Sequence, residues 1–283
     1  MKNIRKLIWI MIFIVFFIVG CNKKVDNSMN ESIKKDKIMT IDNISEKENS
    51  SNINVSNKVN DKENNDDKEI IEIENEEIKT IVIDPGHSSI GNFEKEPIAP
   101  DSNKTKYKDV LGATGVFTNI PEHKTTVSIG LLLRDKLIDM GYNVVLTKSE
   151  VDKSISNIER AQIGNDNNAD LVIRIHADSS NDKNVNGASI LVPSKNKYTD
   201  NISDISMAYG KKIIDIYTEK LSLKNRGCIY RDDMTGFNWS DVPVVILEMG
   251  FLSNMEDDKF ISNKNNHDNI ADAIAIGIDK CFE

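Results

Sequence analysis

From about residue 78 onwards, short apolar runs alternate with longer segments in which apolar side chains recur every three or four residues. This alternation predicts strands and helices in turn. Strands are expected over residues 80–84, 143–147, 171–175, 188–192 and 244–247. Because these runs are largely apolar, we expect a mostly parallel twisted sheet with helices on both faces, in a single three-layer α/β domain.

The helices are expected between these strands. The first covers residues 125–140 and ends at a glycine, and the second begins at Ser156, whose spacing from Glu159 is typical of a capping box. A third contains apolar side chains every four residues over 205–217. Asp268 is expected to cap the last helix. The segment between the first strand and first helix is expected to be a long polar loop.

The first twenty residues have a different pattern. Basic side chains precede an apolar run over residues 7–19, which is shorter than a usual membrane span and typical of a signal peptide. The run ends at Gly20-Cys21, which resembles the bacterial lipoprotein signal. We therefore expect a signal peptide over 1–20 and lipid attachment at Cys21, with a short uncleaved membrane anchor as the alternative. Both interpretations place the remaining chain outside the cytoplasmic membrane.

Residues 21–77 are dominated by Asn, Lys, Asp, Glu and Ser and contain no aromatic side chain. Such a segment buries too little apolar surface to offset the entropy of ordering, so it is expected to be a disordered polar tether. The folded domain is then expected over 78–283. The net charge of −9 argues against a nucleic-acid partner. Cys228 and Cys281 leave a disulfide open without favouring one.

Candidate chemistry lies at the ends of the predicted strands. His87, His176 and Glu248 each follow directly on an apolar run, and Glu122 follows a proline at the start of a predicted helix. Reactive side chains of open α/β sheets gather at the carboxyl ends of the strands. Two neutral imidazoles with a carboxylate are a common zinc ligand set, and a second carboxylate can act as the base. The sequence therefore predicts a zinc centre at this edge.

Other polar residues are expected to lie outside this centre. His123 is next to a helix start and His267 is in an Asn-rich segment, and both are expected at the surface. Glu94, Glu96 and Asp101 are alternative carboxylates in the long polar loop, where nearby prolines favour an exposed excursion.

Four blocks of the sequence together resemble one known family. They are IVIDPGH ending at His87, GATGVFTNIPE ending at Glu122, ADLVIRIH ending at His176, and VPVVILEMGFLSN around Glu248. In this order they are similar to the zinc-dependent N-acetylmuramoyl-L-alanine amidases, over the whole folded part. The resemblance implies one Zn²⁺ per chain, bound by His87, Glu122 and His176, with Glu248 as catalytic base.

The implied reaction is hydrolysis of the amide bond between N-acetylmuramic acid and L-alanine in peptidoglycan. A lipoprotein signal and tether suit a cell-wall enzyme anchored in the membrane. Arg226 and Arg231 flank the segment before Glu248 and are weak candidates for contacts with substrate carboxylates. Asp84 and Asp178 are candidates for orienting the histidines, although a strand-end aspartate equally caps a neighbouring turn.

Two other functions remain open. A zinc peptidase acting on stem peptides could use the same ligand set, and a wall-binding lipoprotein without activity could keep the fold. A serine hydrolase is disfavoured because the chain has no G-x-S-x-G motif. The sequence gives no indication of a protein activator.

Overall fold

The computed structural model describes residues 77–283. The predicted signal peptide over 1–20, Cys21 and the tether up to residue 76 lie outside the described residues. In the described part, no helix combines the length and the apolar character that crossing a bilayer requires.

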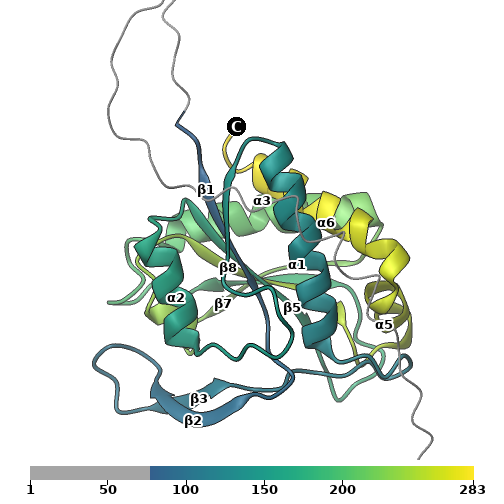
Figure 1. Ribbon diagram of the computed structural model, residues 1–283, viewed down its shortest axis with the longest axis horizontal. Helices are drawn as coiled ribbons and strands as arrows, with labels where there is room; N and C mark the ends of the chain where they lie inside the picture. Colours follow the sequence, from purple (N-terminus) through teal and green to yellow (C-terminus); the bar gives the residue numbers. More distant parts are fainter. Residues whose placement is uncertain (1–76) are drawn as a thin grey trace, which may run out of the picture. The chain divides into compact units, whose positions relative to one another are not determined.

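The centre of the domain is a six-stranded sheet with the order β4-β1-β5-β8-β6-β7 (Figure 1). Its strands are, in that order, Asn143–Leu146, Thr80–Pro85, Leu171–Asp178, Val244–Phe251, Ala188–Pro193 and Asn225–Arg231. The first four are parallel, whereas β6 is antiparallel to β8 and β7 is parallel to β6. The segment joining β5 to β6, residues 179–187, is too short for a parallel crossover, so the chain returns in the opposite direction. The predicted mostly parallel sheet is confirmed.

Helices cover both faces of this sheet, as predicted. One face packs against α1 (Glu122–Asp139), α3 (Ser203–Leu221) and α6 (Lys264–Asp279), through strand side chains such as Ile81 and Ile83. The other face, which includes Val82, packs against α2 (Asn157–Asp166) and the short α4 (Thr235–Asn238). Alternate strand residues therefore serve two separate apolar layers, which explains the continuous apolar runs. A further helix, α5 (Met255–Ser262), follows β8.

The helix starts agree with the sequence in one case and not in another. The capping box of α2 is confirmed: Ser156 Oγ accepts from the Glu159 amide at 3.2 Å, and Glu159 Oε2 accepts from the Ser156 amide at 2.8 Å. The prediction that Asp268 caps the last helix is wrong. The helix begins at Lys264, because the Asn263 side chain already accepts from the Asn265 amide at 3.1 Å.

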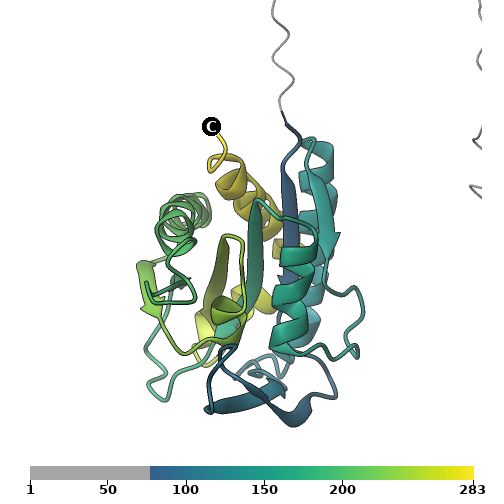
Figure 2. The ribbon, with the colours of Figure 1, turned by 90° about the vertical axis from the view of Figure 1, so that its left-hand side faces the viewer.

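The predicted polar loop before α1 contains a β-hairpin. Its strands are β2 (Asn92–Pro97) and β3 (Thr105–Asp109), which form a separate two-stranded antiparallel sheet. Figure 2 shows this hairpin, in blue, below the end of the main sheet. Glu96 is buried in it, with only 3% of its surface exposed, and accepts from the Asn157 amide at 3.0 Å. The expectation that Glu96 is solvated is therefore wrong, because the N-terminus of α2 covers it.

The two ends of the described chain lie close together. Glu77 and Ile78 line one surface depression with Asp279, Phe282 and Glu283. This depression is at the amino end of β1, whereas His87 follows the carboxyl end of that strand (Figure 1).

Candidate metal centre

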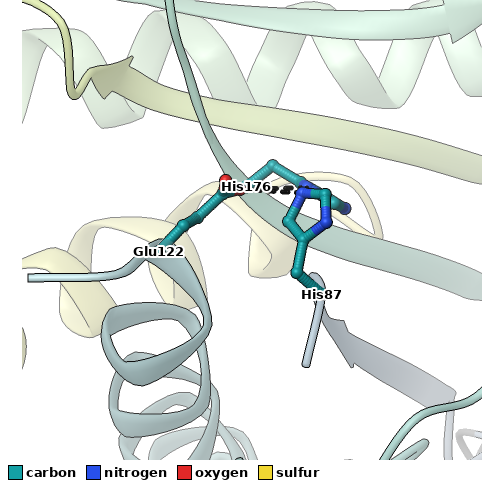
Figure 3. Close-up of side chains that lie close together, drawn as sticks. All are labelled: His87, Glu122 and His176. Carbon is teal, nitrogen blue, oxygen red and sulfur yellow. Dashed lines mark hydrogen bonds and ion pairs between the residues drawn. The ribbon is translucent and has the colours of Figure 1, made fainter. Parts of the chain in front are cut away.

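Three of the predicted site residues converge on one point. His87 follows β1, His176 is on β5, and Glu122 is the first residue of α1 (Figure 3). His87 Nε2 lies 3.1 Å from His176 Nδ1 and 3.3 Å from Glu122 Oε1, and His176 Nδ1 lies 3.2 Å from the same oxygen. The three atoms thus form a nearly regular triangle.

This triangle suits a metal ion. Tetrahedral zinc with ligands at about 2.0–2.2 Å separates its ligand atoms by about 3.3 Å, close to the distances between these nitrogen and oxygen atoms. Two imidazole lone pairs and a carboxylate oxygen directed at one point repel one another unless a cation or a proton lies between them. The donor set of two nitrogens and one carboxylate oxygen is also one that catalytic zinc takes. The residues therefore fit a zinc ion.

The turn after β1 is built around the two histidines. His87 has a left-handed backbone conformation with φ of 59°. Its Nδ1 lies 2.7 Å from the Val110 carbonyl oxygen, so the Nδ1 proton is donated there and Nε2 presents its lone pair to the cluster. Gly86 packs against the imidazole of His176: a Cβ at position 86 would lie 2.4 Å from His176 Cε1. A side chain at position 86 would displace a predicted ligand.

Three consecutive carbonyl groups of this turn accept hydrogen bonds from side chains of other segments. The donors are Arg160 Nη1 to Pro85 at 2.9 Å, Thr126 Oγ1 to Gly86 at 3.0 Å, and Lys148 Nζ to His87. The turn is therefore held by α2, by α1 and by the segment after β4. These donors are far from one another in the sequence, which gives no signal of their common role.

Glu122 is fixed by backbone amides. Its Oε2 accepts from the Ala113 amide at 2.8 Å and its Oε1 from the Ala177 amide at 3.0 Å. The residue is buried at the N-terminus of α1, where free N–H groups favour a negative charge. Gly112 leaves room for it, because a Cβ there would lie 2.7 Å from Glu122 Oε2.

The protonation of the cluster follows from burial and charge. Burial alone would raise the pKa of Glu122, but hydrogen bonds and charge from both histidines hold that pKa well below its usual range. Burial lowers the pKa of His176 to about 4. Burial would also lower the pKa of His87, but the Glu122 carboxylate raises it above the ordinary value. Glu122 is thus ionised and His176 neutral near pH 7, as metal ligands must be.

Glu248 lies beside this cluster. It is half-buried on β8, directly opposite His176 in the register of the sheet, and lines the same cavity as His87 and His176. Burial, together with the nearby Glu122 and Asp178 carboxylates, raises the pKa of Glu248 well above its ordinary value. A carboxylate with raised proton affinity suits the role of general base.

The cavity beside the cluster measures about 550 Å³. The metal-centre side of its wall includes His87, His176 and Glu248, and the β2–β3 hairpin forms much of the rest. The remaining lining residues are Lys95, Thr105, Lys106, Tyr107, Val110, Asn157, Arg174, Met234, Thr235 and Ile246. The sequence did not predict this hairpin wall, because its strands lack a continuous apolar run.

Asp84 does not orient the histidines. It is completely buried and accepts from Arg174 Nε at 2.7 Å, from Thr147 Oγ1 at 2.6 Å and from Arg160 Nη1. The expectation that Asp84 orients a histidine is therefore wrong, because two buried guanidinium groups occupy both carboxylate oxygens. For Asp178 the structure favours the turn-capping alternative, since its Oδ1 accepts from the Ser179 amide at 2.6 Å.

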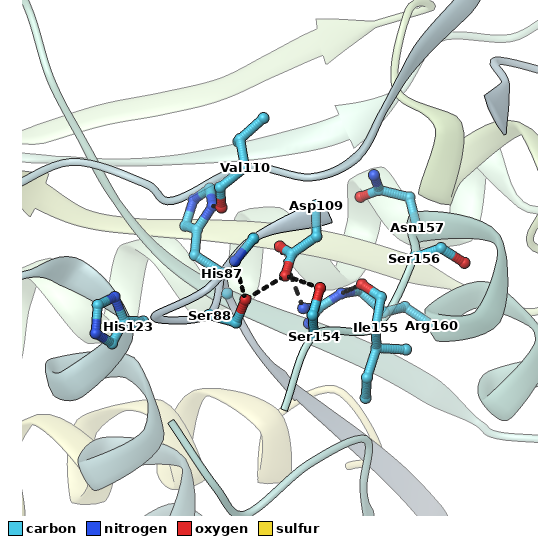
Figure 4. A network of polar contacts seen from close by, with 12 residues as sticks. His87, Ser88, Asp109, Val110, His123, Ser154, Ile155, Ser156, Asn157 and Arg160 are labelled. Atoms are coloured by element: carbon cyan, nitrogen blue, oxygen red, sulfur yellow. Dashed lines mark hydrogen bonds and ion pairs between the residues drawn. The ribbon is translucent and has the colours of Figure 1, made fainter. Parts of the chain in front are cut away.

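A polar network joins the hairpin to the turn after β1 (Figure 4). Asp109, the last residue of β3, accepts from Ser88 Oγ at 2.6 Å and from Ser154 Oγ at 2.8 Å. Arg160 Nη2 lies 3.8 Å from the other oxygen of Asp109. The hairpin is therefore attached next to His87 by buried polar groups.

The other two histidines are buried, so their predicted surface position is wrong. His123 is 6% exposed and His267 is 3% exposed. His267 lies inside α6, where its Nδ1 is 2.9 Å from Ser128 Oγ and its Nε2 is 3.0 Å from the Ile261 carbonyl oxygen. Neither histidine belongs to the metal-ligand cluster of the described residues. For His267, the partner Ser128 lies on α1, far from it in the sequence, so its burial could not be inferred from the local sequence.

The two candidate arginines have partners outside the metal-ligand cluster. Arg226 is 5.3 Å from the centre of the Phe251 ring, and Arg231 Nε pairs with Asp233 Oδ1 at 2.8 Å. Neither arginine lines the cavity, and their contact with substrate stays a prediction.

Several side chains predicted to lie outside the site do so. Glu94 and Asp101 are exposed and pair with lysines, as expected for solvated carboxylates.

Cys228 and Cys281 are both free thiols, so the disulfide that the sequence left open is not formed.

The fold is that of an α/β protein with a mostly parallel sheet. The His-Glu-His cluster at the edge of the sheet and the neighbouring Glu248 make this edge a candidate metal-hydrolase centre. Residues 81–280 match the N-acetylmuramoyl-L-alanine amidase family, and the chain belongs to this family. The resemblance found in the four sequence blocks is thereby confirmed.

Individual relatives are more distant. The chain is 26% identical over 204 residues to the "Probable cell wall amidase LytH" of Staphylococcus epidermidis, covering 72% of this chain and 58% of that protein. It therefore spans somewhat more than half the length of that relative. It is 27% identical over 207 residues to YqiI of Bacillus subtilis, covering 73% and 86%.

Solved structures confirm the fold. The N-acetylmuramyl-L-alanine amidase Ami1 of Mycobacterium abscessus superimposes with a TM-score of 0.66 at 24% sequence identity, covering 72% of this chain and 99% of that chain. An N-acetylmuramoyl-L-alanine amidase of Clostridium difficile has a TM-score of 0.59 at 21% identity, covering 72% and 97%. The β-sheet and its helices are thus arranged as in these two proteins.

Proposed function

We propose that this protein is a zinc-dependent N-acetylmuramoyl-L-alanine amidase that acts on peptidoglycan outside the cytoplasmic membrane. The observation that carries the proposal is the triangle of His87, Glu122 and His176 beside a cavity that Glu248 lines, in a chain of this family. The lipoprotein-type sequence at Cys21 supports attachment to the membrane through a lipid.

His87, Glu122 and His176 would hold one Zn²⁺ per chain. When bound, zinc supplies a Lewis acid for the scissile carbonyl and lowers the pKa of its water towards about 7. Glu248 takes a proton from the attacking water and passes it to the departing L-alanine nitrogen, which leaves as a free amine. The backbone amides of Ala113 and Ala177 keep Glu122 oriented during these proton transfers. Arg226 and Arg231 remain proposed contacts for stem-peptide carboxylates.

The test is mass identification of the soluble products that the zinc-loaded full chain releases from purified peptidoglycan. An amidase releases stem peptides that begin with a free amino-terminal L-alanine. Fragments cut within the stem would instead identify a peptidase. Binding to peptidoglycan without any release would identify the inactive wall-binding protein.

Glu248→Gln tests the proposed general base. It removes the proton acceptor with little change of shape, so kcat is expected to fall by about 100-fold or more while zinc content is retained. Zinc is quantified by metal analysis and turnover by product formation. Glu94→Gln, an exposed residue outside the cavity, is the matched control and keeps both. Normal turnover of Glu248→Gln excludes Glu248 as the base.

A further inference from the structure

Three cationic side chains line the cavity beside the metal centre, and two of them are already paired. Arg174 Nε donates to the buried carboxylate of Asp84 at 2.7 Å. Lys106 Nζ donates to Asp233 Oδ2 at 2.8 Å. The third cation is Lys95, on strand β2 of the hairpin.

The charge of Lys95 is available to a ligand. The residue is exposed, and none of the acidic side chains within residues 77–283 forms an ion pair with it. Its Nζ lies 6.0 Å from the centre of the Tyr107 ring, which also lines the cavity. A cation at this distance from an aromatic ring in contact with water gains little, so Lys95 loses little by binding an anion instead.

The charges on the cavity wall are unequally distributed. Glu248 is the one carboxylate among the described residues that line it, and it lies on the side of the sheet and the metal centre. Lys95 lies on the hairpin. The charge distribution therefore suits a ligand that places its reacting bond at the metal centre and an anionic group near Lys95 on the hairpin.

The proposed substrate has such a group. In a peptidoglycan stem, the second residue is a D-glutamate linked onward through its side-chain carboxyl, so its α-carboxyl group is either free or amidated. This α-carboxyl group is on the second residue counted from the scissile nitrogen. Two extended residues span about 7 Å, so the carboxyl group lies about that far from the scissile bond. A cavity of 550 Å³ is within the range of about 300–1,000 Å³ that accommodates ligands of this size.

We propose that Lys95 is a specificity-determining residue that binds the free α-carboxylate of the second stem residue and selects against its amidated form. This inference rests on the proposed amidase function. An ammonium–carboxylate hydrogen bond is stronger than one to a neutral amide. It is strongest at low ionic strength, since salt screens partly exposed charges.

The test compares two synthetic substrates with the zinc-loaded full chain at low salt. They are N-acetylmuramoyl-L-alanyl-D-glutamate and its α-amidated form, N-acetylmuramoyl-L-alanyl-D-isoglutamine, each with the side-chain carboxyl blocked as a methylamide so that only the α-position differs in charge. The expected ratio of kcat/KM is about tenfold or more in favour of the carboxylate form. Lys95→Met is expected to bring this ratio to about 1, and Lys95→Arg to retain the preference. Raising the salt concentration is expected to reduce the wild-type ratio.

Lys104→Met is the matched control. Lys104 is an exposed lysine of the same hairpin that does not line the cavity, so its loss leaves the ratio unchanged. A wild-type ratio of 1, or a ratio that Lys95→Met leaves intact, overturns the role of Lys95 but not the amidase function. Cleavage of neither substrate by the wild-type chain counts against the amidase function itself.

Discussion

His87 is held in a backbone conformation that residues other than glycine seldom adopt. Such a conformation costs about 1–2 kcal/mol and persists only where its surroundings enforce it. Lys148 does so, because its ammonium group is buried and donates to the His87 carbonyl oxygen. Burial, with the Arg160 charge nearby, lowers the pKa of Lys148 to about 8. Within residues 77–283 this ammonium group has no other hydrogen-bond partner. Burying the charge costs free energy, which fits a role in holding the turn at His87.

Lys148→Met is therefore expected to weaken zinc binding by about 10- to 100-fold, as loss of groups that orient metal ligands usually does. Methionine keeps most of the volume and removes the donor. Affinity is measured by chelator competition, with circular dichroism to confirm folding.

Lys148→Arg, which restores a donor, is expected to recover most of the affinity. Lys153→Met changes an exposed lysine nearby and is expected to have no effect. Unchanged affinity of a folded Lys148→Met protein would show that the turn needs no such donor.

At the scale of elements, the sequence predicted the strands and helices that have a regular pattern of apolar residues. The runs ending at His87 and His176 are buried on both faces, so their strand character and common edge followed from pattern alone. The β2–β3 hairpin has no such pattern: its segments NFEKEP and TKYKD are mostly polar. Glu96, a buried carboxylate of this hairpin, accepts hydrogen bonds from the start of α2, about sixty residues further along the chain. Single-sequence periodicity carries no information about that distant partner.

Glu96→Ala is expected to destabilise the domain by about 1–2 kcal/mol. The carboxylate accepts from the Asn157 and Ile158 amides at 3.0 and 3.3 Å, as a capping group does at a helix N-terminus. The change is measured as the free energy of unfolding in urea. Glu94→Ala removes an exposed glutamate of the same strand and is expected to cost no more than a few tenths of a kcal/mol. Equal effects of the two substitutions would contradict the capping role.

At the scale of the whole molecule, Asp84 joins segments that are far apart in the sequence. Its carboxylate links β1 to β5, to α2 and to Thr147 after β4. Burial alone would raise the pKa of Asp84, but the Arg160 and Arg174 guanidinium groups hold it well below its usual range. The unfolded chain therefore binds a proton at this carboxylate more readily than the folded protein does. The stabilisation is complete above about pH 4 and is lost as the pH falls below it.

Asp84→Asn is accordingly expected to lower the free energy of unfolding by about 3–5 kcal/mol at pH 7, because it removes the buried carboxylate that both guanidinium groups contact. The difference between the wild-type protein and the variant is expected to shrink as the pH falls below about 4, as measured in urea. Asp204→Asn, an exposed aspartate of α3, is the control. A difference that stays constant with pH would contradict this assignment.

One surface depression is lined by Glu77, Ile78 and the last residues of the chain. It is at the amino end of β1, whereas His87 lies beyond the carboxyl end of that strand. An affinity tag, a fluorophore or a solid support joined at either end of the domain is thus remote from the cavity. If the protein is coupled to beads through its C-terminal residue, the cavity faces away from the bead. It then stays accessible to insoluble material, which cannot diffuse into a crowded surface.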